Sequence, residues 1–485
     1  MSNIHDPLGS RRFGYGRSGI GSNSPVRSSG TVVVMLARPL SCSIPPQELS
    51  ARPYRMLIVN AQTKCGRREH LSKTERTQPF ADFGEIKSGG GIGRGSAALN
   101  KPVTLPDTST APEASALRGL FEPFEVKSLS LRNRFAMAPM TRAFSPDGIP
   151  GADVAEYYRR RAAGGVGLII TEGTYIPDPA AGPHTRVPRI YGDSSLGGWK
   201  SVVDAVHAEG GSIIPQLWHL GVERGENSRL NPEVETVSPS GLALDGTRLG
   251  REFTTSDLDD LKQSWVDAAL NAKNTGFDGL ELHGAHGYLL DEFLWAGTNV
   301  RTDGYGGSLE ARTRFPAEVV AAIREAVGDE FAIVYRFSQW KSGHYDARIA
   351  QSPAELGRIL TPLVDAGVDV LHPSTRRHWE PAFAELDGED GTLGLAGWTK
   401  KLTGLPTITV GSVGLDSVFT TAFTGEAASA VTGLERLEAQ YERGEFDMVA
   451  IGRALLADPE WVEKLRTGRA DEHIAFTAEH RTHLN

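Results

Sequence analysis

The chain has 485 residues, of which 39% are hydrophobic, and a formal net charge of −9 at pH 7. This length permits one large domain with an appendage or two to three ordinary domains, and no run of about 18 apolar residues indicates a membrane span. The charge is unevenly distributed, because residues 1–117 hold 15 Lys and Arg against 8 Asp and Glu, whereas the remainder holds 36 against 52. The acidic body argues against nucleic acid as a partner, since a phosphate backbone requires a basic face.

Both cysteines, Cys42 and Cys65, lie in the basic N-terminal part of the chain. A disulfide framework, a cysteine-ligated zinc site and an iron–sulfur cluster are therefore excluded from the acidic body. This cysteine usage fits a reducing compartment, and we expect a cytoplasmic protein.

Residues 1–117 are rich in Gly, Ser, Arg and Pro and show little hydrophobic periodicity. Such a composition buries too little apolar surface to offset chain entropy, so we predict a largely disordered extension. An organellar transit peptide, an interaction tail and a start codon assigned too far upstream are the alternatives. Residues 1–46 carry five Arg and a single acid, Asp6, before Glu48, but their glycines weaken the amphipathic helix that a transit peptide needs.

From Leu120 onwards, short β-branched runs alternate with amphipathic stretches. Eight strands are predicted, at residues 134–140, 167–171, 212–217, 279–283, 331–337, 368–372, 407–410 and 447–451. Helices are predicted among and after them, at residues 152–163, 196–209, 255–275, 308–327, 352–366, 418–443 and 459–467. Apolar strands that alternate with helices indicate a parallel sheet covered by helices.

The count of eight strands predicts a closed (β/α)8 TIM barrel over residues 118–485. The alternative is an open doubly wound sheet, which carries a Gly-rich turn after its first strand. Ala-Pro-Met-Thr-Arg stands at that point of this chain instead, and the barrel is therefore favoured.

Barrel enzymes place their chemistry at the C-terminal ends of the strands, and this chain has large hydrogen-bonding side chains there. In chain order they are Thr141, Arg142, Glu172, Gln216, Trp218, His219, His283, His286, Tyr288 and Arg336. Gly411-Ser412 and Gly452-Arg453 follow the last two strands, where backbone N–H groups of barrels often bind phosphate. The two glycine turns together predict a phosphorylated ligand.

His283 and His286 allow three interpretations. They could supply two ligands of a metal site, although no third ligand is convincingly placed. They could be buried structural histidines, or a pair of hydrogen-bond donors to one substrate oxygen, which we favour. Tyr288 could deliver a proton or be an ordinary rim tyrosine, and Arg336 could face a ligand or form a salt bridge that closes the barrel end.

Several motifs resemble those of one known family. They are Ala138-Pro-Met-Thr-Arg142, Thr171-Glu-Gly173, Pro215-Gln-Leu-Trp-His219, His283-Gly-Ala-His-Gly-Tyr288, Asn299-Val-Arg-Thr-Asp-Gly-Tyr-Gly-Gly-Ser308 and Ile451-Gly-Arg453. Over about residues 120–475 the chain resembles the Old Yellow Enzyme family of NAD(P)H:flavin oxidoreductases. Residues 1–117 have no counterpart in that family.

The resemblance implies FMN, bound non-covalently at the barrel mouth. It assigns the flank of the ring to Pro139, Met140, Thr141 and Gly173, the pyrimidine edge to Gln216, the N1 and O2 side to Arg336, and the phosphate to Gly411, Ser412, Gly452 and Arg453. It also makes His283 and His286 the substrate-oxygen donors and Tyr288 the proton donor. We expect the loop with Asp303 to be structural, pinned at the barrel rim by a nearby Arg. The aromatic and basic residues of the segment Ser374–Trp379 could line the active-site mouth or contact the phosphates of the nicotinamide cofactor.

The expected function is hydride transfer from NAD(P)H, through flavin N5, to the β-carbon of an alkene conjugated to a carbonyl or nitro group. We expect no metal, membrane or nucleic-acid partner, and either a monomer or a homo-oligomer. The main alternative is a flavin-binding barrel with a binding or sensor role and little ene-reductase activity. Iron–sulfur multidomain relatives are disfavoured by the absence of cysteine, and a metal-dependent barrel hydrolase is a weaker alternative.

Overall fold

The computed structural model describes residues 116–416, 432 and 434–485. The extension predicted at residues 1–117 lies outside this part of the chain, except for its last two residues. These residues already belong to a short 3-10 helix, η1 (Ala116–Phe121).

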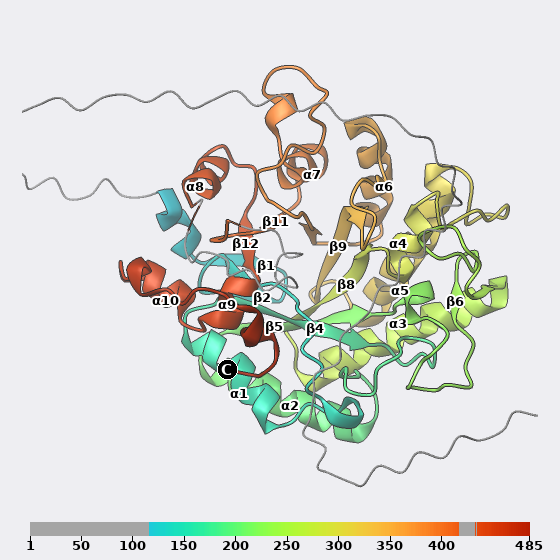
Figure 1. Ribbon diagram of the computed structural model, residues 1–485, viewed down its shortest axis with the longest axis horizontal. Helices are drawn as coiled ribbons and strands as arrows, with labels where there is room; N and C mark the ends of the chain where they lie inside the picture. The colour runs from blue at the N-terminus through green and yellow to red at the C-terminus, as the bar shows by residue number, and fades with distance from the viewer. Residues whose placement is uncertain (1–115, 417–431, 433) are drawn as a thin grey trace, which may run out of the picture. The chain divides into compact units, whose positions relative to one another are not determined.

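Eight parallel strands form the centre of the described chain (Figure 1). They are β3 (Phe135–Met137), β4 (Leu168–Tyr175), β5 (Ser212–Trp218), β8 (Gly279–His286), β9 (Ala332–Lys341), β10 (Val370–Pro373), β11 (Ile408–Val410) and β12 (Met448–Ile451). Each strand pairs with the next one along the chain, and β12 pairs with β3. Two parallel bridges, Leu371 to Thr407 and Ser374 to Val410, join β10 to β11 and complete the ring. The predicted (β/α)8 barrel is confirmed.

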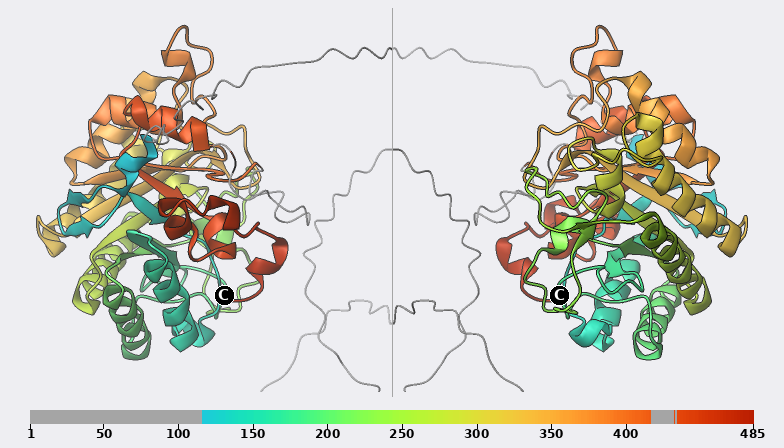
Figure 2. Two further views of the ribbon diagram at one scale, coloured as in Figure 1. Left: turned by 90° about the vertical axis from the view of Figure 1, so that its left-hand side faces the viewer. Right: turned by 90° about the vertical axis from the view of Figure 1, so that its right-hand side faces the viewer.

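Helices form an outer layer around the strands (Figure 1, Figure 2). They are α1 (Ala152–Ala163), α2 (Asp193–Ala208), α3 (Thr255–Thr275), α5 (Leu309–Val327), α6 (Pro353–Asp365), α7 (Leu395–Thr403), α8 (Leu434–Glu442), α9 (Arg453–Ala457) and α10 (Trp461–Arg466), with the short α4 (Leu289–Leu294) after β8. Helix α7 was not predicted, and the first part of the helix predicted at 418–443 lies outside the described residues. Helix α3 illustrates how the sequence sets the boundaries, because a capping box of Thr254 and Asp257 begins it and Gly276, with a left-handed φ of 100°, ends it.

The core has two layers, which follow from the alternation of side chains along each strand. In β4, Leu168 and Ile170 contribute to the cluster inside the barrel, whereas Ile169 joins the larger cluster between strands and helices. An antiparallel hairpin of β1 (Phe124–Val126) and β2 (Leu129–Leu131) packs against the inner cluster. The sequence analysis did not predict this hairpin.

Three aspartates bind the N-terminal ends of neighbouring strands together. Asp278, Asp369 and Asp447 directly precede β8, β10 and β12, and each accepts a hydrogen bond from a backbone N–H at the start of the adjacent strand. The donors are Ile213, Ile333 and Thr407, at 2.7, 2.8 and 2.9 Å. Each aspartate thereby fixes the register of two strands at the bottom of the barrel.

Three strands run further at their C-terminal ends than the sequence predicted. The predicted strands ended at residues 171, 283 and 337, whereas β4, β8 and β9 continue to Tyr175, His286 and Lys341. Register shifts interrupt β4 before Gly173 and β8 before His286. His286 therefore lies inside a strand rather than after it, because a bulge lets pairing continue past the glycine at residue 284.

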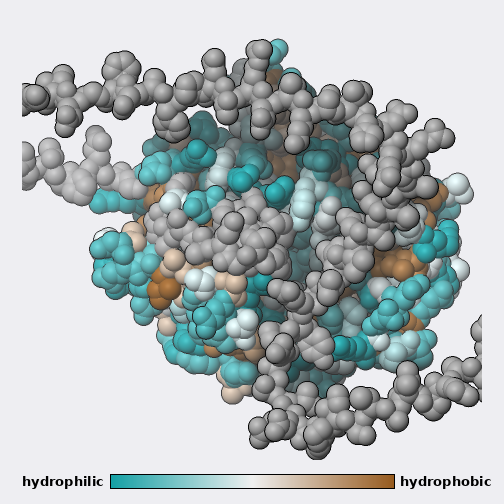
Figure 3. All heavy atoms as spheres, in the orientation of Figure 1, coloured by the Kyte–Doolittle hydropathy of each residue, from teal (hydrophilic) through white to brown (hydrophobic). Residues whose placement is uncertain are grey.

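The described surface that faces the viewer in Figure 3 is mostly hydrophilic, with small hydrophobic areas scattered over it. Within the described part of the chain, none of the helices has both the length and the apolar character needed to cross a membrane.

Candidate active site

A pocket of about 280 Å³ opens at the C-terminal ends of the barrel strands. Its lining includes Pro139 and Met140 after β3, His286 and Tyr288 at the end of β8, Arg336 and Trp340 on β9, Ser374, Thr375 and Arg376 after β10, Gly411 and Ser412 after β11, and Gly452 and Arg453 after β12. Residues predicted from six separate strand ends thus converge on one cavity. The first three residues of the segment Ser374–Trp379 line this cavity.

Four predicted site residues lie beside the lining rather than in it. Gln216 and His283 are buried, with 3% and 5% of their surface exposed. Gly173 lies against the ring of Trp218, and a Cβ atom at this glycine would come within 2.3 Å of the ring carbon Cε3. Thr141 follows the lining residue Met140 and is exposed.

The imidazole of His286 is held from three sides. Its backbone adopts a left-handed φ of 68°, which is unusual for a residue other than glycine. Its backbone N–H donates to Ser338 Oγ at 2.9 Å, and its Nε2 shares a 2.8 Å hydrogen bond with Ser374 Oγ. Trp340 stacks on the imidazole with a centroid separation of 4.4 Å. The ring therefore has one orientation at the pocket wall.

His283 completes an aromatic corner with its neighbours. Its ring centroid lies 5.1 Å from that of His286 and 4.9 Å from that of Tyr288, and Trp218 stacks on it at 6.1 Å. Its buried Nδ1 atom has no hydrogen-bond partner among the described residues. Since buried polar atoms are nearly always paired, this nitrogen indicates a ligand that binds here.

Both histidines of this corner are uncharged at neutral pH. Burial, and then the nearby Arg336 guanidinium, lower the pKa of His283 and of His286 well below the ordinary value. A neutral imidazole donates from one nitrogen only, so the two rings can act as hydrogen-bond donors without bringing charge into the pocket. Burial also raises the pKa of Tyr288 to about 12, which keeps its phenol protonated.

Arg336 brings a buried positive charge to the pocket. Its Nη2 donates to Ser374 Oγ at 3.2 Å, whereas its Nε has no partner in the described part of the chain. Burial lowers its pKa, but a guanidinium stays charged at neutral pH. The salt bridge considered as its alternative role is not formed with any described residue.

The part of the pocket that follows β11 and β12 combines tight backbone turns with a second arginine. Gly411 has φ 135°, and a Cβ atom there would lie 2.7 Å from the backbone oxygen of Thr375. Ser412 also has a positive φ, of 50°. Arg453, the first residue of α9, donates from Nη2 to Ser412 Oγ at 3.4 Å. The predicted phosphate residues are therefore brought together.

Sequence reasoning missed several residues that support the histidine corner. Lys341 Nζ and Asp291 Oδ1 form a fully buried ion pair at 2.8 Å, and Asp291 Oδ2 accepts from the backbone N–H of Gly287 at 2.7 Å. The pair thereby fixes the turn between His286 and Tyr288. The sequence shows Asp291 and Lys341 only as charged residues near apolar runs. This pattern does not predict that two residues fifty positions apart form an ion pair.

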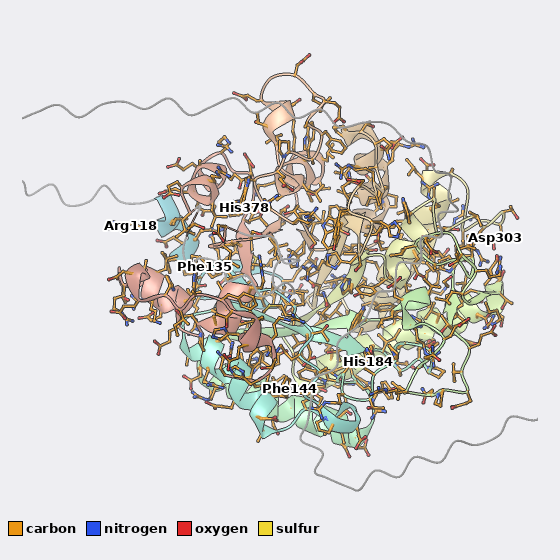
Figure 4. All side chains as sticks on the ribbon, viewed as in Figure 1. Arg118, Phe135, Phe144, His184, Asp303 and His378 are labelled. Atoms are coloured by element: carbon orange, nitrogen blue, oxygen red, sulfur yellow. The ribbon has the colours of Figure 1, made fainter. Side chains whose placement is uncertain are left out.

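The expected structural pin on the neighbouring loop is confirmed. Arg301 Nη2 lies 2.6 Å from Asp303 Oδ2, and Arg301 also donates to the backbone oxygens of Pro239 and Phe253. Asp303 lies at the edge of the molecule in Figure 4, labelled among the side chains at the right. This loop therefore supports the barrel rim and does not reach the pocket lining.

The pocket fits a flat, polar, phosphorylated cofactor. The buried atoms His283 Nδ1 and Arg336 Nε have no partner among the described residues, and Ser412 and Arg453 line the same pocket as Arg336. In the described residues, no group of three or more His, Cys, Asp and Glu side chains could hold a metal ion. Fold and site together define a barrel oxidoreductase of the flavin-binding type.

Comparisons with known proteins identify the family. The sequence profile of the NADH:flavin oxidoreductase / NADH oxidase family matches residues 119–472. The chain is 36% identical over 361 residues to an NADH oxidase of Thermoanaerobacter brockii, which covers 73% of this chain and 51% of that protein. It is 34% identical over 365 residues to 12-oxophytodienoate reductase 7 of Oryza sativa subsp. japonica, which covers 72% and 87%.

A solved structure agrees with these sequence matches. Morphinone reductase in complex with tetrahydroNAD superimposes with a TM-score of 0.60 at 32% identity, over 72% of this chain and 91% of that one. The chain therefore belongs to the NADH:flavin oxidoreductase / NADH oxidase family, and the resemblance to Old Yellow Enzymes is confirmed. FMN is the cofactor of this family, and NAD(P)H is its reductant.

Proposed function

We propose that this protein is an ene-reductase, which uses NAD(P)H to reduce an alkene conjugated to a carbonyl or nitro group. The observation that carries the proposal is the corner of His283, His286 and Tyr288, where two neutral donors and a protonated phenol meet with ring centroids 4.9 to 6.5 Å apart. Two relatives named as reductases, of morphinone and of 12-oxophytodienoate, support it.

Binding of FMN is assigned to residues at both ends of the pocket. Gly411, Ser412, Gly452 and Arg453 would hold its phosphate, while Pro139, Met140, Thr141, Gly173, Gln216 and Arg336 would contact its ring system. When bound, FMN would supply the two-electron redox chemistry between NAD(P)H and the alkene, which no side chain supplies. The fixed positive charge of Arg336 would stabilise the reduced, electron-rich state of the cofactor, and Arg336 cannot lose that charge by deprotonation.

The histidine corner would bind and polarise the substrate. Neutral N–H groups of His283 and His286 would donate to the carbonyl or nitro oxygen, so that electron density moves away from the β-carbon. Trp340 and Ser374 hold His286 in place, which removes the need to reorient the ring during reaction.

Tyr288 would supply the proton that completes the reduction. Its half-buried phenol is protonated at neutral pH and lies beside His283. Transfer to the α-carbon balances the hydride added at the β-carbon, and water then restores the phenol proton. One alkene and one NAD(P)H are consumed in each cycle.

An anaerobic titration followed by absorbance tests the proposal. The purified protein is expected to be yellow, to bleach on addition of NADPH or NADH, and to recover its colour when cyclohexenone is added. A protein that binds flavin but is not bleached, or that stays bleached with cyclohexenone and a nitroalkene, would instead be a binding or sensor barrel.

A further inference from the structure

A chain of three side chains crosses the barrel interior beside the pocket. Gln216 Nε2 on β5 donates to Glu281 Oε1 on β8 at 2.8 Å, and His372 Nδ1 on β10 lies 2.6 Å from Glu281 Oε2. Gln216 is 3% exposed, and the other two residues are fully buried. No role in the proposed reaction has been given so far to Glu281.

The carboxylate decides how Gln216 is oriented. An amide has nearly the same shape after a half-turn, so packing alone does not set which end carries oxygen and which carries nitrogen. An ionised carboxylate only accepts hydrogen bonds, so the NH2 group of Gln216 must face Glu281. The amide is then left with its oxygen and one N–H for a ligand, which is a matched pair for the adjacent N–H and C=O groups of a cyclic imide.

The carboxylate of Glu281 also compensates positive charge in the site. Arg336 is the buried cation of the pocket, and Glu281 is the acid whose field acts on it. His283, His286 and His372 add no positive charge, because burial lowers the pKa of each. Replacing Glu281 with a neutral group would therefore leave the charge of Arg336 less compensated.

The contacts of Glu281 differ from those of the carboxylates at the other end of the barrel. Asp278, Asp369 and Asp447 each accept a backbone N–H group as well as binding a side chain. Among the described residues, the hydrogen-bond partners of the Glu281 carboxylate are side chains alone, Gln216 and His372. A buried carboxylate is costly to keep, and here its hydrogen bonds orient the pocket-side groups rather than the backbone.

We infer that Glu281 is a positioning residue for the flavin, which orients Gln216 toward the imide edge of the isoalloxazine ring and lowers the reduction potential of the bound cofactor. The inference rests on the proposed function, since it assumes FMN in this pocket with its pyrimidine end toward Gln216 and Arg336. It assigns the carboxylate no contact with the substrate.

The test compares Glu281→Gln with Asp369→Asn in the full chain. Glu281→Gln is expected to weaken FMN binding about tenfold and to raise the midpoint potential, because a negative charge is removed near the reduced cofactor. For the separate measurement of potential, a tenfold change in the equilibrium between oxidised and reduced cofactor shifts the midpoint potential by about 30 mV for a two-electron couple. Asp369→Asn removes a partly buried carboxylate at the distant end of the barrel and should alter neither quantity. Unchanged potential and FMN affinity in Glu281→Gln would overturn the inference.

A double-mutant cycle separates positioning from general damage. If Glu281 acts on FMN affinity through Gln216, then Gln216→Leu and Gln216→Leu with Glu281→Gln should bind FMN equally well. Additive losses in FMN affinity would contradict the inference. If Glu281→Gln does not fold, Glu281→Asp takes its place: it keeps the charge but withdraws it from Gln216, so affinity should fall while the potential stays constant. Unchanged affinity in that variant would also overturn the inference.

Measurements on the wild-type protein distinguish the proposed function from the role of Glu281. A wild-type protein that binds no FMN, or reduces no activated alkene, contradicts the proposed function. A wild-type protein that does both, while Glu281→Gln matches it in potential and affinity, contradicts only the role of Glu281.

Discussion

At the N-terminal end of the barrel, Asp278, Asp369 and Asp447 accept backbone hydrogen bonds and join adjacent strands. At the C-terminal end, His283 Nδ1 and Arg336 Nε are buried without a protein partner in the described residues. The first end ties neighbouring strands together through these carboxylates, whereas the second end places these two nitrogens at or near the pocket.

The two ends also differ in their effect on the free energy of unfolding. A buried polar group without a partner costs about 1–3 kcal/mol, so the pocket end destabilises the empty protein. A ligand that pairs with these nitrogens recovers that free energy and stabilises the fold. Substitutions at the pocket end are therefore expected to affect mainly catalysis, and substitutions at the other end mainly the free energy of unfolding.

The largest expected effect comes from Tyr288→Phe. Loss of the phenolic proton should slow alkene reduction by about 10²–10⁴, which is the range of general acid catalysis. Reduction of the flavin by NADPH should keep its rate, because that step needs no proton from this residue. Rapid mixing can measure the two half-reactions separately, and equal slowing of both would contradict the assigned role.

His283→Ala should reduce the rate of alkene reduction by on the order of 10²–10³, the usual loss for one hydrogen bond to a developing negative charge. Flavin content should be unchanged. Asn at the same position, which retains a donor, should recover part of the rate. An Ala variant with normal alkene reduction would remove the histidine corner from the mechanism.

Lys341→Met should affect both stability and chemistry, since Lys341 supports the pocket end from within the core. Its loss leaves Asp291 buried without its cation, and breaking such a pair destabilises by about 3–5 kcal/mol. The turn that carries Tyr288 should loosen as well. Denaturant unfolding and steady-state kinetics check the two parts, and an exposed-lysine change such as Lys200→Met is the control.

Asp369→Ala should lower the free energy of unfolding by about 1–3 kcal/mol and leave kcat and KM unchanged. The substitution leaves the backbone N–H of Ile333 and the guanidinium of Arg324 without their shared acceptor. Urea denaturation measures the loss. A variant of normal stability but reduced turnover would contradict the division of roles between the two ends.

Glu172 offers a pH-dependent test of similar or smaller size. Burial raises the pKa of this carboxyl to about 7, although its Oε2 accepts from the backbone N–H groups of Arg142 and Ala143. The folded state thus holds a proton that the unfolded state releases near pH 4.5, so this residue lowers stability as pH rises from about 4.5 to 7. Glu172→Gln should flatten that part of the stability profile by about 1–3 kcal/mol. An identical slope in both proteins would contradict the raised pKa.

The features that could be predicted from the sequence are local. Each strand shows as an apolar run, and the polar residues after it show as a break in that run, so the barrel and the corner of His283 to Tyr288 were both visible. The hairpin of β1 and β2 was missed because two strands of three residues carry too little pattern.

Features that depend on contacts between distant residues could not be predicted. The bulge before His286, the pairing of Lys341 with Asp291 and the stacking of Trp340 on His286 are set by strand register, which no local pattern contains. The sequence does contain one indication of a special role for Glu281, because a carboxylate within the apolar run Gly-Leu-Glu-Leu-His is unusual for a barrel strand. Its partners still required the three-dimensional structure.

The joint between β10 and β11 links folding to function in another way. Two bridges close the ring there, and one of them belongs to Ser374, whose hydroxyl also contacts His286 and Arg336. The β10–β11 joint and a wall of the pocket therefore share one residue. Flavin fluorescence during refolding should report ring closure itself, because an open ring does not present these three side chains together.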